Sequence, residues 1–150
     1  MNPENWLTLK RNVRFGDCDS AGVLHFHNLL RWAHESWEES LEVYGIKSED
    51  IFPVSIFRKN NTIFPIINCE VKFFHPIKLG QLLTINLLPE KKNNFLFEIK
   101  TIFINDKVKL AECTILHCSV DSMSSKKAQL PEIIDLWIEA SNIKNIIKEC

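Results

Sequence analysis

Apolar and polar residues alternate along most of this chain, and the alternation predicts a protein made largely of β-strands. Residues 7–15 alternate up to Gly16, which is typical of a strand that ends at a glycine turn. The connection 105–107 predicts a tight hairpin. In the strand before it, Phe95, Phe97, Ile99, Thr101 and Phe103 share one face. Four further strands are predicted after residue 60, with hardly any helical pattern between them: 62–74, 82–88, 95–105 and 108–120.

Two other segments have the periodicity of helices. From Asn28 to Gly45 apolar residues recur at intervals of three and four, which predicts one long amphipathic helix that Asn28 caps and Gly45 ends. Pro131 opens a second, C-terminal helix. One long helix followed by a meander of strands predicts an α+β fold, in which an antiparallel sheet wraps a single helix. The apolar sides of the two helices are Leu30, Ala33, Trp37, Leu41 and Tyr44, and then Ile133, Ile134, Trp137, Ala140 and Ile147.

Composition narrows the classes of protein that remain. With 150 residues, 45% hydrophobic and 25% charged, residues 1–150 are predicted to form one globular domain. A net charge of −1 offers no general attraction for nucleic acid. Because no apolar run approaches about 18 residues and no signal peptide is recognisable, we expect no membrane span and a cytoplasmic location. The five scattered cysteines argue against a disulfide framework or a structural zinc site.

The main candidates for catalytic residues lie at residues 14–28, between the first predicted strand and the long helix. Asp17 and Asp19 stand beside the helix start, where unpaired backbone N–H groups and a partial positive charge can stabilise an oxyanion. Since a carboxylate can act as a nucleophile or a general base, the arrangement suits acyl transfer. The alternative is that both aspartates only cap a turn. Cys18, between two carboxylates that disfavour its thiolate, is expected to be passive.

These residues carry a resemblance to a known family. Residues 15–23, Phe-Gly-Asp-Cys-Asp-Ser-Ala-Gly-Val, together with Asn28 and Trp32, resemble the signature of hot-dog-fold acyl-CoA thioesterases of the 4-hydroxybenzoyl-CoA thioesterase type. Residues 64–73 and 75–82 resemble that family's second strand and the turn after it. The resemblance implies a hot-dog fold, with an antiparallel sheet around one long central helix and, here, a C-terminal helix. It departs from the family at Gln81, where an acidic residue is common.

Within the superfamily, residues 34–38 and the spacing of Gly22-Val23 to Phe26 are most similar to 1,4-dihydroxy-2-naphthoyl-CoA hydrolases of phylloquinone and menaquinone biosynthesis. The resemblance implies that Asp19 is catalytic, either attacking the thioester carbonyl or activating water. It implies that the backbone N–H at Phe26 holds the oxyanion. No cofactor is expected, because coenzyme A is part of the substrate. The implied partners are the acyl-CoA and further copies of the chain, as a homotetramer built as a dimer of dimers with sites at its interfaces.

Residues that would bind the substrate are less sharply marked. We expect His25 to line the acyl pocket, since His25 and His27 lack the further ligands that a metal site needs. Pro65 is expected in the wall of that pocket, with Phe64, Phe73 and Phe74 either beside it or in the ordinary core.

Contacts with the coenzyme A phosphates require basic residues. Lys91 and Lys92 occupy a position that resembles the family's cationic nucleotide contact, and Arg58 and Lys59 form a second candidate patch. The alternative for such lysines is an ordinary solvated surface.

Other functions and other catalytic residues remain open at this stage. Some hot-dog thioesterases use a glutamate of the central helix, and this helix carries Glu35, Glu38, Glu39 and Glu42, which are otherwise a solvated or interfacial face. The same fold also suits hydroxybenzoyl-, phenylacetyl- or short-chain acyl-CoA. A noncatalytic acyl-CoA-binding module is the alternative from another class.

Overall fold

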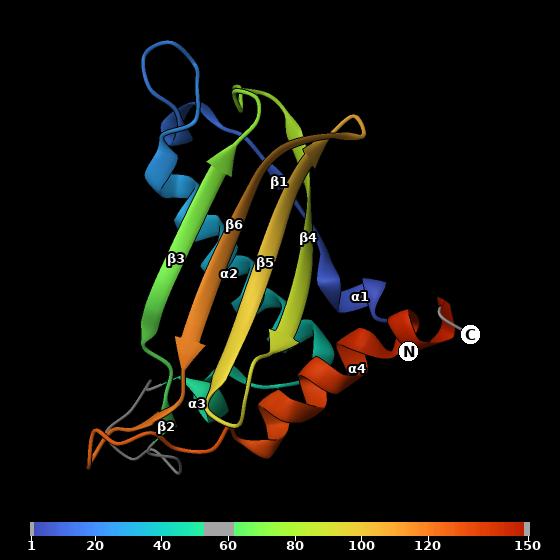
Figure 1. Cartoon of the computed structure of the whole chain (residues 1–150). Helices are drawn as coiled ribbons and strands as arrows, with labels where there is room; N and C mark the ends of the chain where they lie inside the picture. The colour runs from blue at the N-terminus through green and yellow to red at the C-terminus, as the bar shows by residue number, and fades with distance from the viewer. Residues whose placement is uncertain (1, 53–61, 149–150) are drawn as a thin grey trace.

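A five-stranded antiparallel sheet dominates the structure (Figure 1). The computed structural model describes residues 2–52 and 62–148, with side chains up to Ile143. A separate pair of short strands joins β2 (Thr62–Ile63) to β7 (Val120–Asp121). In the order of their pairing, the strands of the main sheet are β1 (Thr8–Asn12), β4 (Leu82–Lys91), β5 (Leu96–Asn105), β6 (Val108–Cys118) and β3 (Ile66–Phe73).

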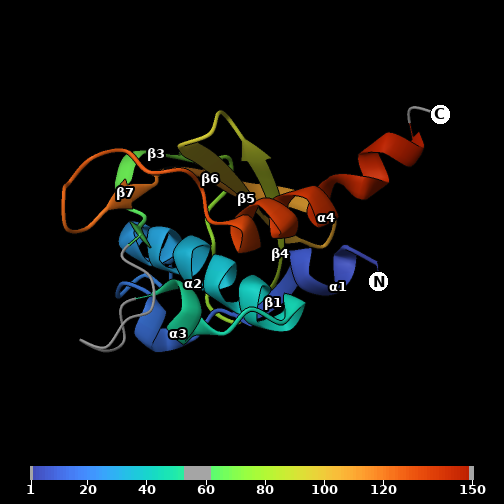
Figure 2. The same cartoon turned by 90° about the horizontal axis from the view of Figure 1, so that it is seen from below.

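The long helix α2 (Phe26–Tyr44) lies against one face of this sheet in both views (Figures 1 and 2). The C-terminal helix α4 (Glu132–Lys148) lies near the end of β4 and contacts that strand. This arrangement confirms the predicted α+β fold, with the sheet wrapped around one helix and a C-terminal helix beside it. The short helical segments are α1 (Glu4–Leu7), the 3-10 turn η1 (Phe15–Asp17) and α3 (Ser48–Ile51).

Trp37 of α2 occupies the centre of the core between helix and sheet. Its ring centroid lies 5.6 Å from Phe97 on β5 and 4.6 Å from His117 on β6. The predicted alternation in β5 is confirmed, because Phe97, Ile99, Thr101 and Phe103 are all buried. Burial of such large aromatic side chains supplies much of the free energy that fixes α2 on the sheet.

The start of α2 differs from the sequence prediction. The helix begins at Phe26, its N-cap is His25, and no side chain caps it. Asn28 is therefore not the cap: it lies inside the first turn, and its side chain donates a hydrogen bond to the Asp17 carbonyl instead. The predicted end of the helix is confirmed, since Gly45 takes a left-handed conformation, φ +111°, that favours glycine.

The strand boundaries also shift for physical reasons. The predicted strand 7–15 is shorter, because Leu7 closes α1 and Phe15 opens η1. The predicted strand 62–74 breaks into β2 and β3 around Pro65, which has no N–H to donate to a ladder. The hairpin prediction is confirmed: Asp106 and Lys107 form the two-residue loop with φ values of 47° and 65°.

His117 is a buried titratable group in this core. Only 1% of its surface is exposed, its ring stacks on Phe97, and its Nδ1 lies 3.2 Å from the Phe64 carbonyl oxygen. Burial lowers the pKa of His117 from 6.5 to about 4, against the opposing effect of the Phe64 hydrogen bond. The nearby His34 ring, 6.0 Å away, lowers the pKa of His117 further.

This histidine predicts acid sensitivity of the fold. Because the unfolded chain binds the His117 proton more tightly, stability should be complete above about pH 6.5 and fall towards pH 4, by about 3 kcal/mol in all. Replacing His117→Gln removes the titration while keeping a hydrogen-bond donor. Denaturant unfolding of both proteins across this range should show the wild type losing more stability than the variant. Equal losses would show that His117 does not contribute.

Candidate active site

The two aspartates lie in a small antiparallel ladder immediately before α2. The Asp19 N–H donates to the Val23 carbonyl at 2.8 Å, and the His25 N–H donates to the Asp17 carbonyl at 3.0 Å. Gly22 makes the turn between the two segments with φ +75°, a conformation that disfavours other residues. The ladder therefore delivers the chain directly from the aspartates into the first turn of the helix.

Alternation within this ladder decides which side chains reach solvent. Cys18 and Leu24 stand opposite each other and are buried, whereas Asp17 and Asp19 are half-buried on the other side. Burial raises the pKa of the Cys18 thiol, and the charges of Asp17 and Asp19 add to the rise. The structure thus agrees with a passive thiol.

Asp17 holds the local backbone together. Its Oδ2 accepts a hydrogen bond from the Arg14 N–H at 2.9 Å, which closes the η1 turn. Its carbonyl accepts the Asn28 side chain at 2.8 Å as well as the His25 N–H. For Asp17, these contacts agree with the alternative that it caps a turn.

Asp19 combines a structural role with a free reactive atom. Its Oδ1 accepts hydrogen bonds from the N–H groups of Ala21, at 2.9 Å, and Val23, at 3.1 Å. The turn-capping alternative is therefore correct for this oxygen. The second oxygen, Oδ2, makes no hydrogen bond to any described residue. One oxygen fixes the carboxylate in place while the other stays available as a nucleophile or base.

The N–H of Phe26 offers the complementary charge. Phe26 is the first residue of α2, so its N–H has no carbonyl partner within the helix. Among the described residues none accepts a hydrogen bond from it. Its chain neighbour His25 pairs with Asp17, which brings this free donor and the aspartate segment to the same place. An oxyanion would find here an unpaired N–H and the positive end of a helix dipole.

An apolar hollow of about 410 Å³ adjoins this helix start. Phe26 lines it from one side, and Phe73 and Phe74 line it from the end of β3. Phe64 does not reach it: its ring lies in the core, 6.3 Å from the Trp37 ring. The other lining residues are Val23, Leu24, His75, Pro76 and Ile77.

His25 and Pro65 lie very differently with respect to this hollow. The His25 side chain is exposed next to Phe26, and its ring stacks on His27 at 5.4 Å. Pro65 precedes β3, whereas the hollow lies at the opposite end of that strand, beside Phe73. Within one chain the structure therefore brings His25, but not Pro65, to the neighbourhood of Asp19.

Lys91 is the last residue of β4 and Lys92 follows it, so both lie at the far end of that strand from the aspartates. The start of this strand lies near the ladder, because the Leu79 N–H donates to Gly22. A ten-residue strand spans about 30 Å. Both lysines also face carboxylates: Lys91 pairs with Asp135 at 2.8 Å, and Lys92 pairs with Glu90 at 3.1 Å and Glu98 at 3.6 Å. The other basic candidates, Arg58 and Lys59, lie outside the described residues.

The glutamates of α2 are engaged elsewhere. Glu35 pairs with Arg11 and Arg31, and Glu39 pairs with Arg11 at 3.1 Å. Glu38 lies 3.6 Å from the His34 ring nitrogen. These contacts favour the interpretation of a polar, ion-paired face over a catalytic glutamate.

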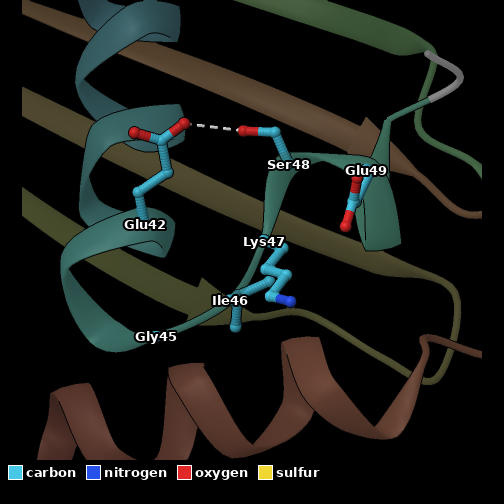
Figure 3. Close-up of a pocket in the computed structure, with 6 residues that line it drawn as sticks. All are labelled: Glu42, Gly45, Ile46, Lys47, Ser48 and Glu49. Carbon is cyan, nitrogen blue, oxygen red and sulfur yellow. Dashed lines mark hydrogen bonds between the residues drawn. The ribbon is translucent and has the colours of Figure 1, made fainter.

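The fourth glutamate, Glu42, lines a separate hollow of about 640 Å³ at the other end of α2 (Figure 3). It accepts a hydrogen bond from the Ser48 hydroxyl at 2.7 Å and so ties α3 to α2. With 19 residues, α2 separates this hollow from the Asp19 ladder by about 28 Å. Its lining, which includes Lys47 and Glu49, presents no paired nucleophile and oxyanion donor.

Across residues 2–52 and 62–148, no three side chains of His, Cys, Asp or Glu gather in a way that would hold a metal ion. Over the same residues, no helix has the length and apolar character needed to cross a bilayer.

Comparisons with known proteins agree with this geometry. The sequence profile of the Thioesterase-like superfamily matches residues 13–138. A relative from Prochlorococcus marinus subsp. pastoris, named 1,4-dihydroxy-2-naphthoyl-CoA hydrolase, is 59% identical over 150 residues, 100% of both chains. A crystal structure from Prochlorococcus marinus strain MIT 9313 has a TM-score of 0.90 at 47% identity, covering 94% of this chain and 99% of that one. A 1,4-dihydroxy-2-naphthoyl-CoA thioesterase from Synechocystis has a TM-score of 0.79 at 25% identity, covering 88% and 94%.

The chain therefore belongs to the thioesterase-like superfamily and has the hot-dog fold. Like its relatives it is a thioester hydrolase. The resemblance found in residues 15–23 is confirmed at the level of the family.

The two hydrogen bonds to Asp19 Oδ1 predict a difference between two substitutions. Asp19→Ala removes the acceptor of both N–H groups and should lower the free energy of unfolding by about 1–2 kcal/mol. Asp19→Asn keeps an oxygen at the same position and should leave stability within about 0.5 kcal/mol of wild type. Denaturant unfolding of the three proteins measures this. An Asp19→Asn protein as unstable as Asp19→Ala would mean that charge, rather than the acceptor, holds the turn.

Proposed function

We propose that this chain hydrolyses 1,4-dihydroxy-2-naphthoyl-CoA in phylloquinone or menaquinone biosynthesis, as a cytoplasmic enzyme. The observation that carries the proposal is the 59% identity, over the full length of both chains, to a relative named for that reaction. The pairing of a half-free Asp19 carboxylate with an unpaired Phe26 N–H supports the chemistry. A cofactor has no role in the proposed reaction.

The proposed reaction uses both groups on one carbonyl. Asp19 Oδ2 either attacks the thioester carbon itself or takes a proton from an attacking water. The carbonyl oxygen becomes an oxyanion, which the Phe26 N–H and the start of α2 stabilise; losing such a donor typically costs about 2.7–4 kcal/mol in the transition state. The carbon–sulfur bond then breaks, and the electrons leave with the coenzyme A thiolate; a thiol like that of cysteine has a pKa of about 8.5, which makes departure easy. When Asp19 attacks, water then hydrolyses the acyl–Asp19 anhydride and frees the carboxylate. In both routes, water supplies the oxygen of the carboxylate product and the proton of the thiol.

The apolar hollow beside Phe26 is the proposed acyl site. Phe73 and Phe74 offer aromatic faces to a ring. The exposed His25, next to Phe26 in the chain, is the proposed hydrogen-bonding group for ring hydroxyls. These features fit an aromatic acyl group better than a long aliphatic chain.

The edge strand β3 supports the proposed assembly. It pairs with β6 on one side only within the described residues, and seven of its eight residues are exposed. Ile66, Ile67 and Phe73 are 48%, 55% and 46% exposed. An exposed apolar edge of this length is a template for pairing with another strand, and the proposed occupant is β3 of a second copy.

Such pairing would complete the acyl site. A two-fold axis that sets two β3 strands antiparallel places the Ile66 end of one beside the Phe73 end of the other. Pro65 of the second copy would then lie near the hollow that Pro65 of the same chain cannot reach. Lys91 and Lys92 would approach a bound nucleotide only from a further subunit, which is the role of the proposed tetramer, a dimer of dimers.

A panel of acyl-CoA substrates tests the function. Thiol release should be at least about tenfold faster, as kcat/KM, with 1,4-dihydroxy-2-naphthoyl-CoA than with hydroxybenzoyl-, phenylacetyl- or short-chain acyl-CoA. Asp19→Asn should reduce kcat by about 10²–10⁴-fold, since it removes a nucleophile or base but keeps the turn.

Asp17→Asn is the matched control for this experiment. It makes the same chemical change two residues away, and its side-chain oxygen can still accept the Arg14 N–H. It should retain kcat within about fivefold. Preference for another acyl group would replace the proposed substrate, tight binding without turnover would indicate a binding module, and an active Asp19→Asn would refute the proposed chemistry.

The exposed edge predicts the effect of a charge on assembly. Ile67→Lys places a cation at an exposed position of β3 and should disrupt edge-to-edge pairing with little cost to the isolated fold. Light scattering after size exclusion should show wild type as a tetramer and the variant as smaller species. The control is Leu136→Lys, at an exposed position of α4. If Leu136→Lys and Ile67→Lys change the oligomeric state equally, β3 is not the interface.

A further inference from the structure

Asn28 is a buried polar side chain, only 9% exposed, in the first turn of α2. Its Nδ2 donates to the Asp17 carbonyl at 2.8 Å, across eleven positions of sequence. Its own N–H donates to the His25 carbonyl at 3.0 Å. A buried amide held in this way adds a direct side-chain bond between the aspartate segment and the first turn of α2.

The two segments carry the two halves of the proposed chemistry. Asp19 lies in the first segment of the ladder, and Phe26 follows its second segment. The Asp17 carbonyl joins them because it accepts both the His25 N–H, at 3.0 Å, and the Asn28 side chain, at 2.8 Å. Of these two bonds, only the one from Asn28 comes from within the helix.

We propose that Asn28 is a positioning residue for hydrolysis, which fixes the Phe26 N–H relative to the Asp19 carboxylate. The inference rests on the proposed function, because it needs both groups to act on one carbonyl. A displacement of about 1 Å between reacting groups can cost about 10²-fold in rate. A bond that holds the helix start against the aspartate segment therefore controls kcat more than substrate binding.

The substitution Asn28→Asp separates positioning from general stability. An ionised carboxylate at position 28 faces the Asp17 carbonyl oxygen and has no proton to donate, whereas a protonated carboxyl donates its O–H and restores the bond. Burial, the absence of a donor and the nearby Asp17 charge raise the pKa of such a carboxyl more than the positive end of α2 lowers it. The ionisable groups of the two elements that meet here are Asp17, Cys18 and Asp19 in the aspartate segment and His25, His27 and Arg31 at the start of α2. All of them remain in the variant.

The experiment measures kcat and KM of the assembled full-length protein on whichever thioester the wild type hydrolyses best. At about pH 8, Asn28→Asp should lower kcat by about 30–100-fold while KM changes less than about threefold. Between about pH 8 and pH 5.5, its kcat relative to wild type at the same pH should recover at least about tenfold. Asn5→Asp, which adds the same charge at an exposed position, should behave as wild type throughout.

Asn28→Ala is a second test of the role of Asn28, because it removes the hydrogen-bond donor without adding a charge. It should lower kcat by a similar factor at all pH values, with no acid recovery, in protein whose circular dichroism and assembly match wild type. Full kcat in either variant at about pH 8, or a loss in Asn28→Asp without acid recovery, would overturn the role of Asn28. The proposed function fails separately, if wild type hydrolyses no thioester or Asp19→Asn remains active.

Discussion

The short ladder between residues 17–19 and 23–25 is the constraint on which the site depends. Its hydrogen bonds turn the chain back on itself at Gly22 and pass it into α2 at a defined point. The same bonds orient the Asp19 carboxylate and leave the Phe26 N–H without a partner among the described residues. The Asp19 carboxylate is negative, and the Phe26 N–H carries a partial positive charge. Because Asp19 lies in one segment of the ladder and Phe26 follows the other, a few local hydrogen bonds hold both in place. The proposed chemistry therefore needs no distant triad.

Packing of α2 against the sheet gives this local unit a fixed place. Trp37 contacts Phe97 and His117 in the middle of the helix, so the first turn is held at one end of the sheet and Glu42 at the other. The ends differ in character. One has an apolar hollow lined by Phe26, Phe73 and Phe74, whereas the other has a hollow lined mainly by polar residues and the Glu42–Ser48 hydrogen bond. Acyl chemistry is supported only at the first.

In the proposed assembly, a single chain provides only part of the substrate site. The apolar hollow is lined from the end of β3, whose outer edge lacks a partner within the described residues, and the lysines that resemble a nucleotide contact lie about 30 Å away along β4. The proposed assembly of several copies would account for both the exposed apolar edge of β3 and the distance of the lysines from Asp19. In this interpretation, residues of β3 that form the interface between copies also line the apolar hollow beside Phe26.

The sequence by itself determined the local features. The alternation of Asp17, Cys18 and Asp19 separates a buried thiol from two half-buried carboxylates, and the residues of 15–23 identify the family, because both depend on neighbours in sequence. The tertiary structure decided the rest. Asn28 looks like a cap until its amide meets a carbonyl eleven residues away. Pro65 and Lys91 look like neighbours of Asp19 until the strand order β1-β4-β5-β6-β3 sets them at the opposite end of the sheet. Which strand ends meet is fixed by long-range pairing and core packing, and no short-range pattern in the chain carries that information.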